Sequence, residues 1–183
     1  MKAKKPALYL ASAVAAAAVA AGGYYALRPR VQVPDRIEAH LNTWYDSPRR
    51  EAERLIELYG PPDDVAPALA TWREREPFKR IAVHGDSPDT YLEHVIGYRA
   101  PPEALEALSR FGHGVRFNPE NEELSARSNL DSLNYLALNL ADEVVKGERT
   151  PEDADAFYVR TARFATFGKS AAYMERLRFE PLP

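Results

Sequence analysis

An uncharged segment near the start of the chain constrains where the rest of the chain can fold. The 22 residues from 6 to 27 include no Asp, Glu, Lys or Arg, and three lysines precede them. At about 1.5 Å per residue, a helix of this length reaches across a hydrocarbon core of roughly 30 Å. The segment is typical of a transmembrane anchor or an export signal, and either assignment leaves the rest of the chain outside the cytoplasm.

The flanks of this segment favour a retained anchor over a cleaved signal. Tyr24 and Tyr25 precede Arg28 and Arg30, which matches the aromatic and basic belt found where a helix leaves a membrane. The three lysines on the other side favour an N-terminus in the cytoplasm. We therefore predict that residues 1–30 form a signal anchor in the inner membrane and that the remaining domain lies in the periplasm.

Two further features of the segment leave alternatives open. Ala18-Val19-Ala20 matches the small-x-small pattern of a signal cleavage site, so secretion to the periplasm after cleavage is the alternative to an anchor. If the anchor is retained, small side chains at helical spacing would let another helix approach closely. That candidate interface consists of Ala11, Ala15, Ala18 and Gly22.

Charge is distributed unevenly along the chain. The net charge is −3, but five of the 24 Lys and Arg precede the first acidic residue, Asp35. Residues 31–183 therefore hold 19 basic residues against 27 acidic ones, a net charge of −8. A domain this acidic is a poor ligand for nucleic acid, whose phosphates require clustered Lys and Arg. The expected partners are the membrane and other membrane or envelope proteins, and no nucleic acid.

The chain contains no cysteine. Disulfides, thiolate catalysis, zinc fingers and iron–sulfur ligation are therefore excluded. The lipid-attachment cysteine of a bacterial lipoprotein is excluded as well, so any membrane attachment has to come from the polypeptide itself.

Hydrophobic periodicity predicts two helices directly after the uncharged segment. Pro34 can begin the first, which extends to about Tyr45. Ser47-Pro48 can begin the second, which Gly60-Pro61-Pro62 ends. We expect residues 31–60 to form a membrane-proximal helical hairpin.

Residues 61–183 are expected to form an α+β domain continuous with that hairpin. The expected strands are 68–73, 78–84, 91–100, 115–117, 123–128 and 174–179, and the expected helices begin near Pro101, Ser128 and Thr150. The helix after Ser128 is apolar on most sides and should be buried. The predicted fold is an antiparallel sheet packed with helices.

Several strings within residues 55–165 resemble a group of uncharacterised bacterial exported or membrane-anchored proteins. They include Tyr59-Gly60-Pro61-Pro62-Asp63, Glu123-Leu124-Ser125-Ala126-Arg127 and Asn134-Tyr135-Leu136-Ala137-Leu138-Asn139-Leu140-Ala141. The group has no activity that could be transferred. A helical pair followed by Tyr59-Gly60-Pro61-Pro62 and a strand with Trp72 is also similar to outer-membrane assembly lipoproteins of the BamE type, which implies a small α+β module. The absence of a lipid-attachment cysteine departs from that family.

No local motif indicates a catalytic residue, a metal site or a cofactor. The four histidines fall in no zinc-ligand spacing, and the common nucleophile and phosphate-binding motifs are missing. One spatial pocket is a hypothesis, because His84 and His94 on neighbouring strands could bind a small ligand together with Arg127 and Asn134. The alternative is that the histidines are structural and that Asn134 belongs to a satisfied polar network with Ser125 or Arg127.

The first predicted β-hairpin is a candidate partner-binding surface. It mixes aromatic side chains with basic ones, which could contact phosphate head groups or an acidic partner. An exposed hairpin with cross-strand ion pairs is the alternative. The candidate residues are Trp72, Arg73, Arg75, Phe78, Lys79 and Arg80.

These observations favour a membrane-anchored extracytoplasmic protein that acts as a structural, assembly or accessory subunit of a bacterial membrane or envelope complex. Because every local catalytic motif is absent, we rank the hypothesis of an enzyme second. The alternative function is an exported enzyme or small-ligand-binding domain that uses the pocket near His84, His94, Arg127 and Asn134.

Overall fold

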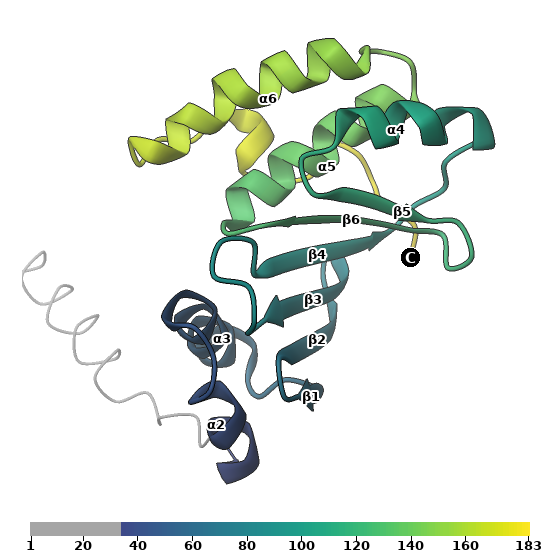
Figure 1. Ribbon diagram of the computed structural model, residues 1–183. Helices are drawn as coiled ribbons and strands as arrows, with labels where there is room; N and C mark the ends of the chain where they lie inside the picture. Colours follow the sequence, from purple (N-terminus) through teal and green to yellow (C-terminus); the bar gives the residue numbers. More distant parts are fainter. Residues whose placement is uncertain (1–33) are drawn as a thin grey trace, which may run out of the picture. The chain divides into compact units, whose positions relative to one another are not determined.

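The computed structural model describes residues 34–183, which form an antiparallel sheet with helices packed against it (Figure 1). The helices are α2 (Asp35–Leu41), α3 (Asp46–Tyr59), α4 (Leu105–Phe111), α5 (Asp131–Val145) and α6 (Pro151–Thr166). The strands are β1 (Asp64–Ala66), β2 (Leu69–Arg75), β3 (Phe78–His84), β4 (Leu92–Gly97), β5 (Val115–Asn118) and β6 (Glu123–Ser128). Short 3-10 turns at Pro102–Ala104 and Ala172–Met174 complete the described part of the chain.

The sheet order is β1-β2-β3-β4-β6-β5, and every neighbouring pair of strands is antiparallel. The prediction of an antiparallel sheet packed with helices, an α+β fold, is therefore confirmed. β5 precedes β6 in the chain but lies outside it, so β5 forms one edge of the sheet.

One face of the sheet carries the core. Trp72, Ile81 and His94 lie opposite one another across β2, β3 and β4, so their side chains share this face. α3 packs on β2 and β3, while α5 packs on β4, β5 and β6. The indole nitrogen of Trp72 donates to the carbonyl of Gly60 at the end of α3, 2.9 Å away. We call this the helix-covered face, and the opposite face the outer face.

α5 is buried on most sides, as its sequence predicts. The sheet contacts one side of it, and α4 and α6 pack against the others (Figure 1). A helix surrounded in this way has to be apolar around most of its circumference. Its buried apolar residues are Leu136, Ala137, Leu138, Leu140, Ala141 and Val144.

Local signals set several helix ends. Thr150 Oγ1 accepts a hydrogen bond from the backbone N–H of Asp153 (3.1 Å), which caps α6. Gly60 ends α3 with φ at +84°, a conformation that favours glycine. The helix predicted to begin near Ser128 begins at Asp131, and the Ser128 hydroxyl bonds to the backbone of Leu130.

Two element boundaries differ from the sequence prediction. α2 ends at Leu41 rather than near Tyr45. A further strand that the sequence prediction did not include, β1 over Asp64–Ala66, pairs with β2. The membrane proximity of α2 and α3 stays a prediction.

The predicted last strand over residues 174–179 is wrong. The side-chain amide of buried Asn139 donates to the carbonyls of Tyr173 (2.9 Å) and Arg176 (2.8 Å). Its oxygen accepts from the backbone N–H of Arg178 (2.7 Å). Because α5 satisfies these backbone groups, the segment has no need of a strand partner, and it joins the sheet through a bridge between Leu182 and Gly97.

Candidate functional site

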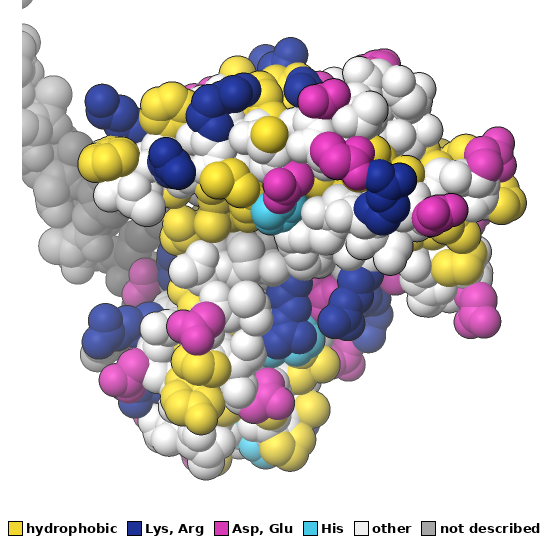
Figure 2. All heavy atoms as spheres, turned by 45° about the horizontal axis from the view of Figure 1, so that its top comes forward, with side chains coloured by type: hydrophobic (Ala, Val, Ile, Leu, Met, Phe, Trp, Pro, Cys, Tyr) yellow, Lys and Arg dark blue, Asp and Glu magenta, His cyan; other side chains and the backbone are white. Residues whose placement is uncertain are grey.

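A groove of about 490 Å³ lies at the β5–β6 edge of the sheet. It is formed where the β3–β4 loop, the α4–β5 loop, the end of β6 and the outer turns of α6 converge. Its lining residues are Asp89, Thr90, His113, Gly114, Arg116, Arg127, Ser128, Asn129 and Tyr158. Figure 2 shows Lys, Arg and His side chains gathered across the hollow in the middle of this face.

Two arginines of the groove are neighbours on paired strands. Arg116 lies opposite Ser125, and Arg127 follows two residues later on the same strand. Diagonal neighbours of this kind have Cβ atoms about 7–8 Å apart. Within residues 34–183 neither guanidinium has an ion-pair partner, although Asp89 also lines the groove. The Nε of Arg127 donates to the carbonyl of Thr90 (2.6 Å), which fixes its side chain at the groove wall.

The loop between α4 and β5 has an unusual backbone. Gly112, His113 and Gly114 have φ angles of +73°, +49° and +73°. A left-handed conformation costs a non-glycine residue such as His113 roughly 1–2 kcal/mol. A Cβ on Gly114 would lie 2.2 Å from the carbonyl oxygen of Arg127, so only glycine fits there. The loop is therefore a tightly constrained turn, whereas the sequence alone suggests a flexible link.

His113 is held in place by α6. Its Nε2 lies 2.7 Å from Oδ1 of Asp155, and its ring stacks on Tyr158 with centroids 3.8 Å apart. Burial raises the pKa of Tyr158, so this hydroxyl stays protonated near neutral pH. The groove thus combines two guanidinium groups with a positioned imidazole and a phenol.

A second recess of about 440 Å³ continues along the outer face and shares Arg116 with the groove. Glu93 lies in it, with Oε2 3.0 Å from Nε2 of His84. Burial alone would raise the pKa of Glu93, but hydrogen bonds from His84 and Ser125 and the nearby positive charges lower it below its ordinary value. Glu93 is therefore ionised at neutral pH.

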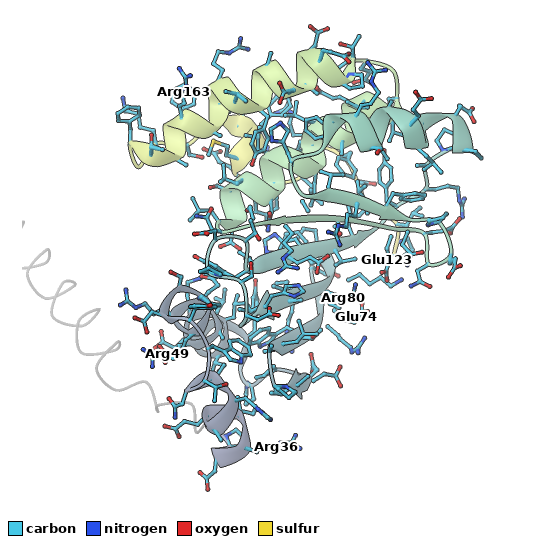
Figure 3. The ribbon with its side chains drawn as sticks, viewed as in Figure 1. Arg36, Arg49, Glu74, Arg80, Glu123 and Arg163 are labelled. Atoms are coloured by element: carbon cyan, nitrogen blue, oxygen red, sulfur yellow. The ribbon has the colours of Figure 1, made fainter. Side chains whose placement is uncertain are left out.

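Arg80 and Glu123 also line this recess, and Glu123 contacts two basic side chains. Its carboxylate lies 3.1 Å from Lys79 Nζ and 3.5 Å from Arg80 Nη2. Figure 3 shows Arg80 and Glu123 close together on the outer side of the sheet. Lys79 and Arg80 thus share one carboxylate, whereas Arg116 and Arg127 have no ion-pair partner within residues 34–183 and are the cations that an anion entering the groove would meet.

The groove offers donors suited to an oxyanion. Arginine presents planar, bidentate donors to carboxylate and phosphate groups. The side-chain amide of Asn129 adds a shorter polar group at the same wall. Within residues 34–183, no three His, Asp or Glu side chains come together in a way that could hold a metal ion.

The four residues of the predicted pocket do not lie together. His84 and Arg127 are on the outer face, because Arg127 lies opposite Glu93 in the register of β4 and β6 and His84 contacts the same glutamate. His94 and Asn134 are fully buried on the helix-covered face, where the Asn134 amide donates to the carbonyl of Leu92 (3.0 Å). The sheet separates the two pairs, and Arg127 alone of the four lines the groove.

His94 belongs instead to a chain of polar side chains that leads from the core to the surface. Its ring stacks on Phe78 with centroids 4.0 Å apart, and its Nε2 lies 3.1 Å from Asp131. Asp131 also contacts Arg54 on α3 at 2.8 Å. Burial would raise the pKa of Asp131, but His94 and Arg54 lower it below its ordinary value. The chain links β4, α5 and α3, which is a structural role.

The predicted partner-binding surface on the β2–β3 hairpin needs correction. Trp72 and Phe78 are buried in the core and cannot contact a partner. Arg73 pairs with Asp64, and Arg75 with Asp63. Together with the pairing of Lys79 and Arg80 to Glu123, this matches the alternative, a hairpin with ion pairs across and beside its strands.

The candidate anchor residues lie outside the described residues. They are Ala11, Ala15, Ala18 and Gly22 at the small-residue face, and Tyr24, Tyr25, Arg28 and Arg30 at the belt. Within residues 34–183, none of the helices has the length and apolar character needed to cross a membrane.

Sequence reasoning missed Arg116 and His113. The two glycines beside His113 are a signal for a special turn, but they do not reveal that the imidazole meets Asp155. No sequence motif marks Arg116 as a binding residue, because its proximity to Arg127 depends on strand register. Comparison with known proteins adds no relative, since no family model, curated protein or solved structure matches the chain.

Proposed function

We propose that this chain is a membrane-tethered extracytoplasmic accessory protein whose groove binds an anionic group, either phosphate or carboxylate, on a ligand or partner. The expected setting is a bacterial membrane or envelope complex. This proposal keeps the small-ligand-binding alternative of the sequence analysis but moves its pocket to the β5–β6 edge.

The tether rests on sequence. Residues 6–27 carry no charge, three lysines precede them, Tyr24 and Tyr25 lie near their end, and Arg28 and Arg30 follow. These features favour a single span with the N-terminus inside, and secretion after cleavage remains the alternative.

The observation that carries the binding function is the pair of arginines at the groove. Arg116 and Arg127 are like charges on paired strands, they line one hollow, and neither has an ion-pair partner within residues 34–183. Two unneutralised guanidinium groups this close repel each other, and an oxyanion between them relieves the repulsion and accepts their hydrogen bonds.

Thermal unfolding of the full chain tests this function. Inorganic phosphate and citrate are titrated at constant ionic strength, with chloride as the reference anion. A ligand at ten times its Kd should raise the midpoint by roughly 3–5 °C for a domain of this size. Arg116→Gln and Arg127→Gln should each weaken this response, and the double variant should lose it.

Arg50→Gln is the matched control, because Arg50 is an exposed arginine on α3 far from the groove lining. It should respond like the wild-type chain. Preference for phosphate over citrate identifies the anion class, and the reverse preference identifies a carboxylate. An equal midpoint rise in the double arginine variant, or no rise in the wild type, would refute binding at the groove.

A further inference from the structure

The C-terminal half of α6 differs in charge from the rest of the domain. No Asp or Glu occurs from residue 156 to residue 174, while Arg160, Arg163 and Lys169 fall within this stretch. The acidic residues of α6 lie in its first turns, at Glu152, Asp153 and Asp155. Within residues 34–183, none of these three cations has an ion-pair partner. A local excess of positive charge therefore stands out from a domain with net charge −8.

The same stretch exposes large apolar side chains. Phe167 is 75% exposed, Val159 46% and Phe164 42%. Positions 156, 159, 160, 163, 164 and 167 follow the spacing of one helix face, so these side chains share the outward side of α6 with Arg160 and Arg163. Figure 3 shows Arg163 on that outward side, and Figure 2 shows basic and hydrophobic side chains mixed over this end of α6.

We define the α6 patch as Val159, Arg160, Arg163, Phe164, Phe167 and Lys169. The opposite side of α6 already supplies the core contacts, since Ala154 and Thr161 are buried and Tyr158 is half-buried against the rest of the domain. Core packing therefore does not explain the patch. Single exposed apolar residues are ordinary, but a cluster on one helix face indicates a contact surface.

The chemistry of the patch matches one kind of partner. A helix face that mixes phenylalanine with arginine and lysine and lacks acidic residues is suited to the interface of an anionic bilayer. The rings enter the boundary between head groups and acyl chains, and the cations meet lipid phosphates. We infer that the α6 patch binds the surface of an anionic lipid bilayer.

The proposed tether makes such a contact favourable, and the inference rests on the tether only for proximity. The seven peptide units from Leu27 to Pro34 span at most about 25 Å when extended. A domain held this close experiences a high effective concentration of membrane surface, so a patch with few cations is sufficient.

The absence of cysteine allows a direct test. Ser170→Cys places a single thiol beside the patch for an environment-sensitive NBD label, and Ser109→Cys on α4 provides the matched control site. The full-length chain is reconstituted into nanodiscs of phosphatidylcholine alone or with about 30% phosphatidylglycerol, a fraction chosen to give a clearly negative surface potential.

The label at residue 170 should brighten and shift to the blue in anionic discs only, and high salt should reverse the shift. The label at residue 109 should give the same spectrum in both. Each arginine contributes about fivefold in affinity for an anionic surface, so Arg160→Gln with Arg163→Gln should reduce the response strongly. Phe167→Ser should remove most of what remains.

Identical spectra at residue 170 in neutral and anionic discs would overturn the inference. A shift that depends on protein concentration and not on lipid charge would also overturn it, and would identify a second copy or another protein surface as the occupant. If the chain does not enter the discs, the tether is refuted, and the labelled chain mixed with preformed vesicles of both compositions still decides whether the patch binds lipid.

Discussion

At the scale of single residues, ion pairing separates the arginines into two groups. Many lie against a carboxylate, as Arg54 does with Glu51 and Arg73 does with Asp64. Exposed pairs of this kind add little to stability. Arg116 and Arg127 differ because they share a groove and lack such partners within residues 34–183. The proposed function therefore assigns anion binding to two arginines that line the groove and have no ion-pair partner among the described residues.

The lowered pKa of Glu93 leads to a prediction about stability in acid. Its pKa is lower in the folded domain than in the unfolded chain, so it stabilises the fold above about pH 4.5, and this contribution is lost as the pH falls through the folded-state pKa. Glu93→Gln should lower the free energy of unfolding by about 1–2 kcal/mol at pH 7, because a hydrogen bond to a charged group is lost. The deficit should shrink towards pH 3.

Urea unfolding at pH 7, 5, 4 and 3 measures this difference. Glu57→Gln, at an exposed position on α3, is the control and should change stability by less than about 0.5 kcal/mol at every pH. A deficit for Glu93→Gln that stays constant down to pH 3 would show that its carboxylate is not responsible.

At the scale of elements, α5 and α6 each do more than fill the core. α5 presents the buried amide of Asn139 to the chain segment after α6, which has no strand partner of its own. α6 contributes Tyr158 to the groove lining, contacts His113 through Asp155, and carries the α6 patch on its outward side. A change in either helix should therefore affect a segment that lies far away in the sequence.

Asn139→Leu tests the first of these links. Leucine is close in size but leaves three backbone groups of residues 173–178 without their partner. A buried unsatisfied group costs about 1–3 kcal/mol, so we expect a loss of about 3 kcal/mol in the free energy of unfolding. The segment after residue 170 should also become sensitive to limited proteolysis.

Asn121→Leu in the exposed β5–β6 loop is the matched control for this substitution. It should change neither the unfolding midpoint in urea nor the proteolytic pattern. Wild-type protection of the C-terminal segment in Asn139→Leu would mean that the bridge between Leu182 and Gly97 is enough to hold it.

At the scale of the whole molecule, the helices and the groove lie on different surfaces of the sheet. α3 and α5 cover the face with Trp72 and His94, and polar side chains line the outer face and the β5–β6 edge. The polar surfaces to which we assign the proposed binding thus lie apart from the core, and substitutions at the groove should leave the fold intact.

The proposed tether leads to a prediction about the whole protein. After a carbonate wash of native membranes, we expect the full-length chain of 20.5 kDa in the pellet. Ala15→Arg should move a large fraction into the supernatant, because an arginine at the centre of a span costs about 2.5–3.5 kcal/mol of insertion free energy. Intact mass spectrometry of both fractions measures the result.

The control is Ala15→Leu, which should stay in the pellet. A soluble chain that lacks about its first 20 residues, the length expected of a cleaved signal, would identify a secreted domain. In that case the anchor is wrong, while the binding function of the groove is unaffected.

Much of the fold could be predicted because its signals are local. The elements and the α+β class were predicted from the alternating residues of β2, β3 and β6 and from the apolar run of α5. Two helix ends were predicted from Thr150 and Gly60. These properties depend on neighbouring residues and on backbone preference, so the amino-acid sequence by itself determined them. The segment over 174–179 misled prediction, because its alternation is also compatible with an irregular chain held by Asn139.

Tertiary structure alone decided the site. Strand register places Arg116 beside Arg127 and puts His84 and His94 on opposite faces of the sheet. A shift of one residue would exchange the faces, so the side chains that become neighbours depend on how whole strands pair and not on any single residue. The exposure of Phe164 could not be predicted from the sequence either. Its position on α6 fits either helix face, and only the packing of α6 on the domain leaves it exposed. Contacts between distant segments set these positions, which is why the groove and the α6 patch emerge only in the folded chain.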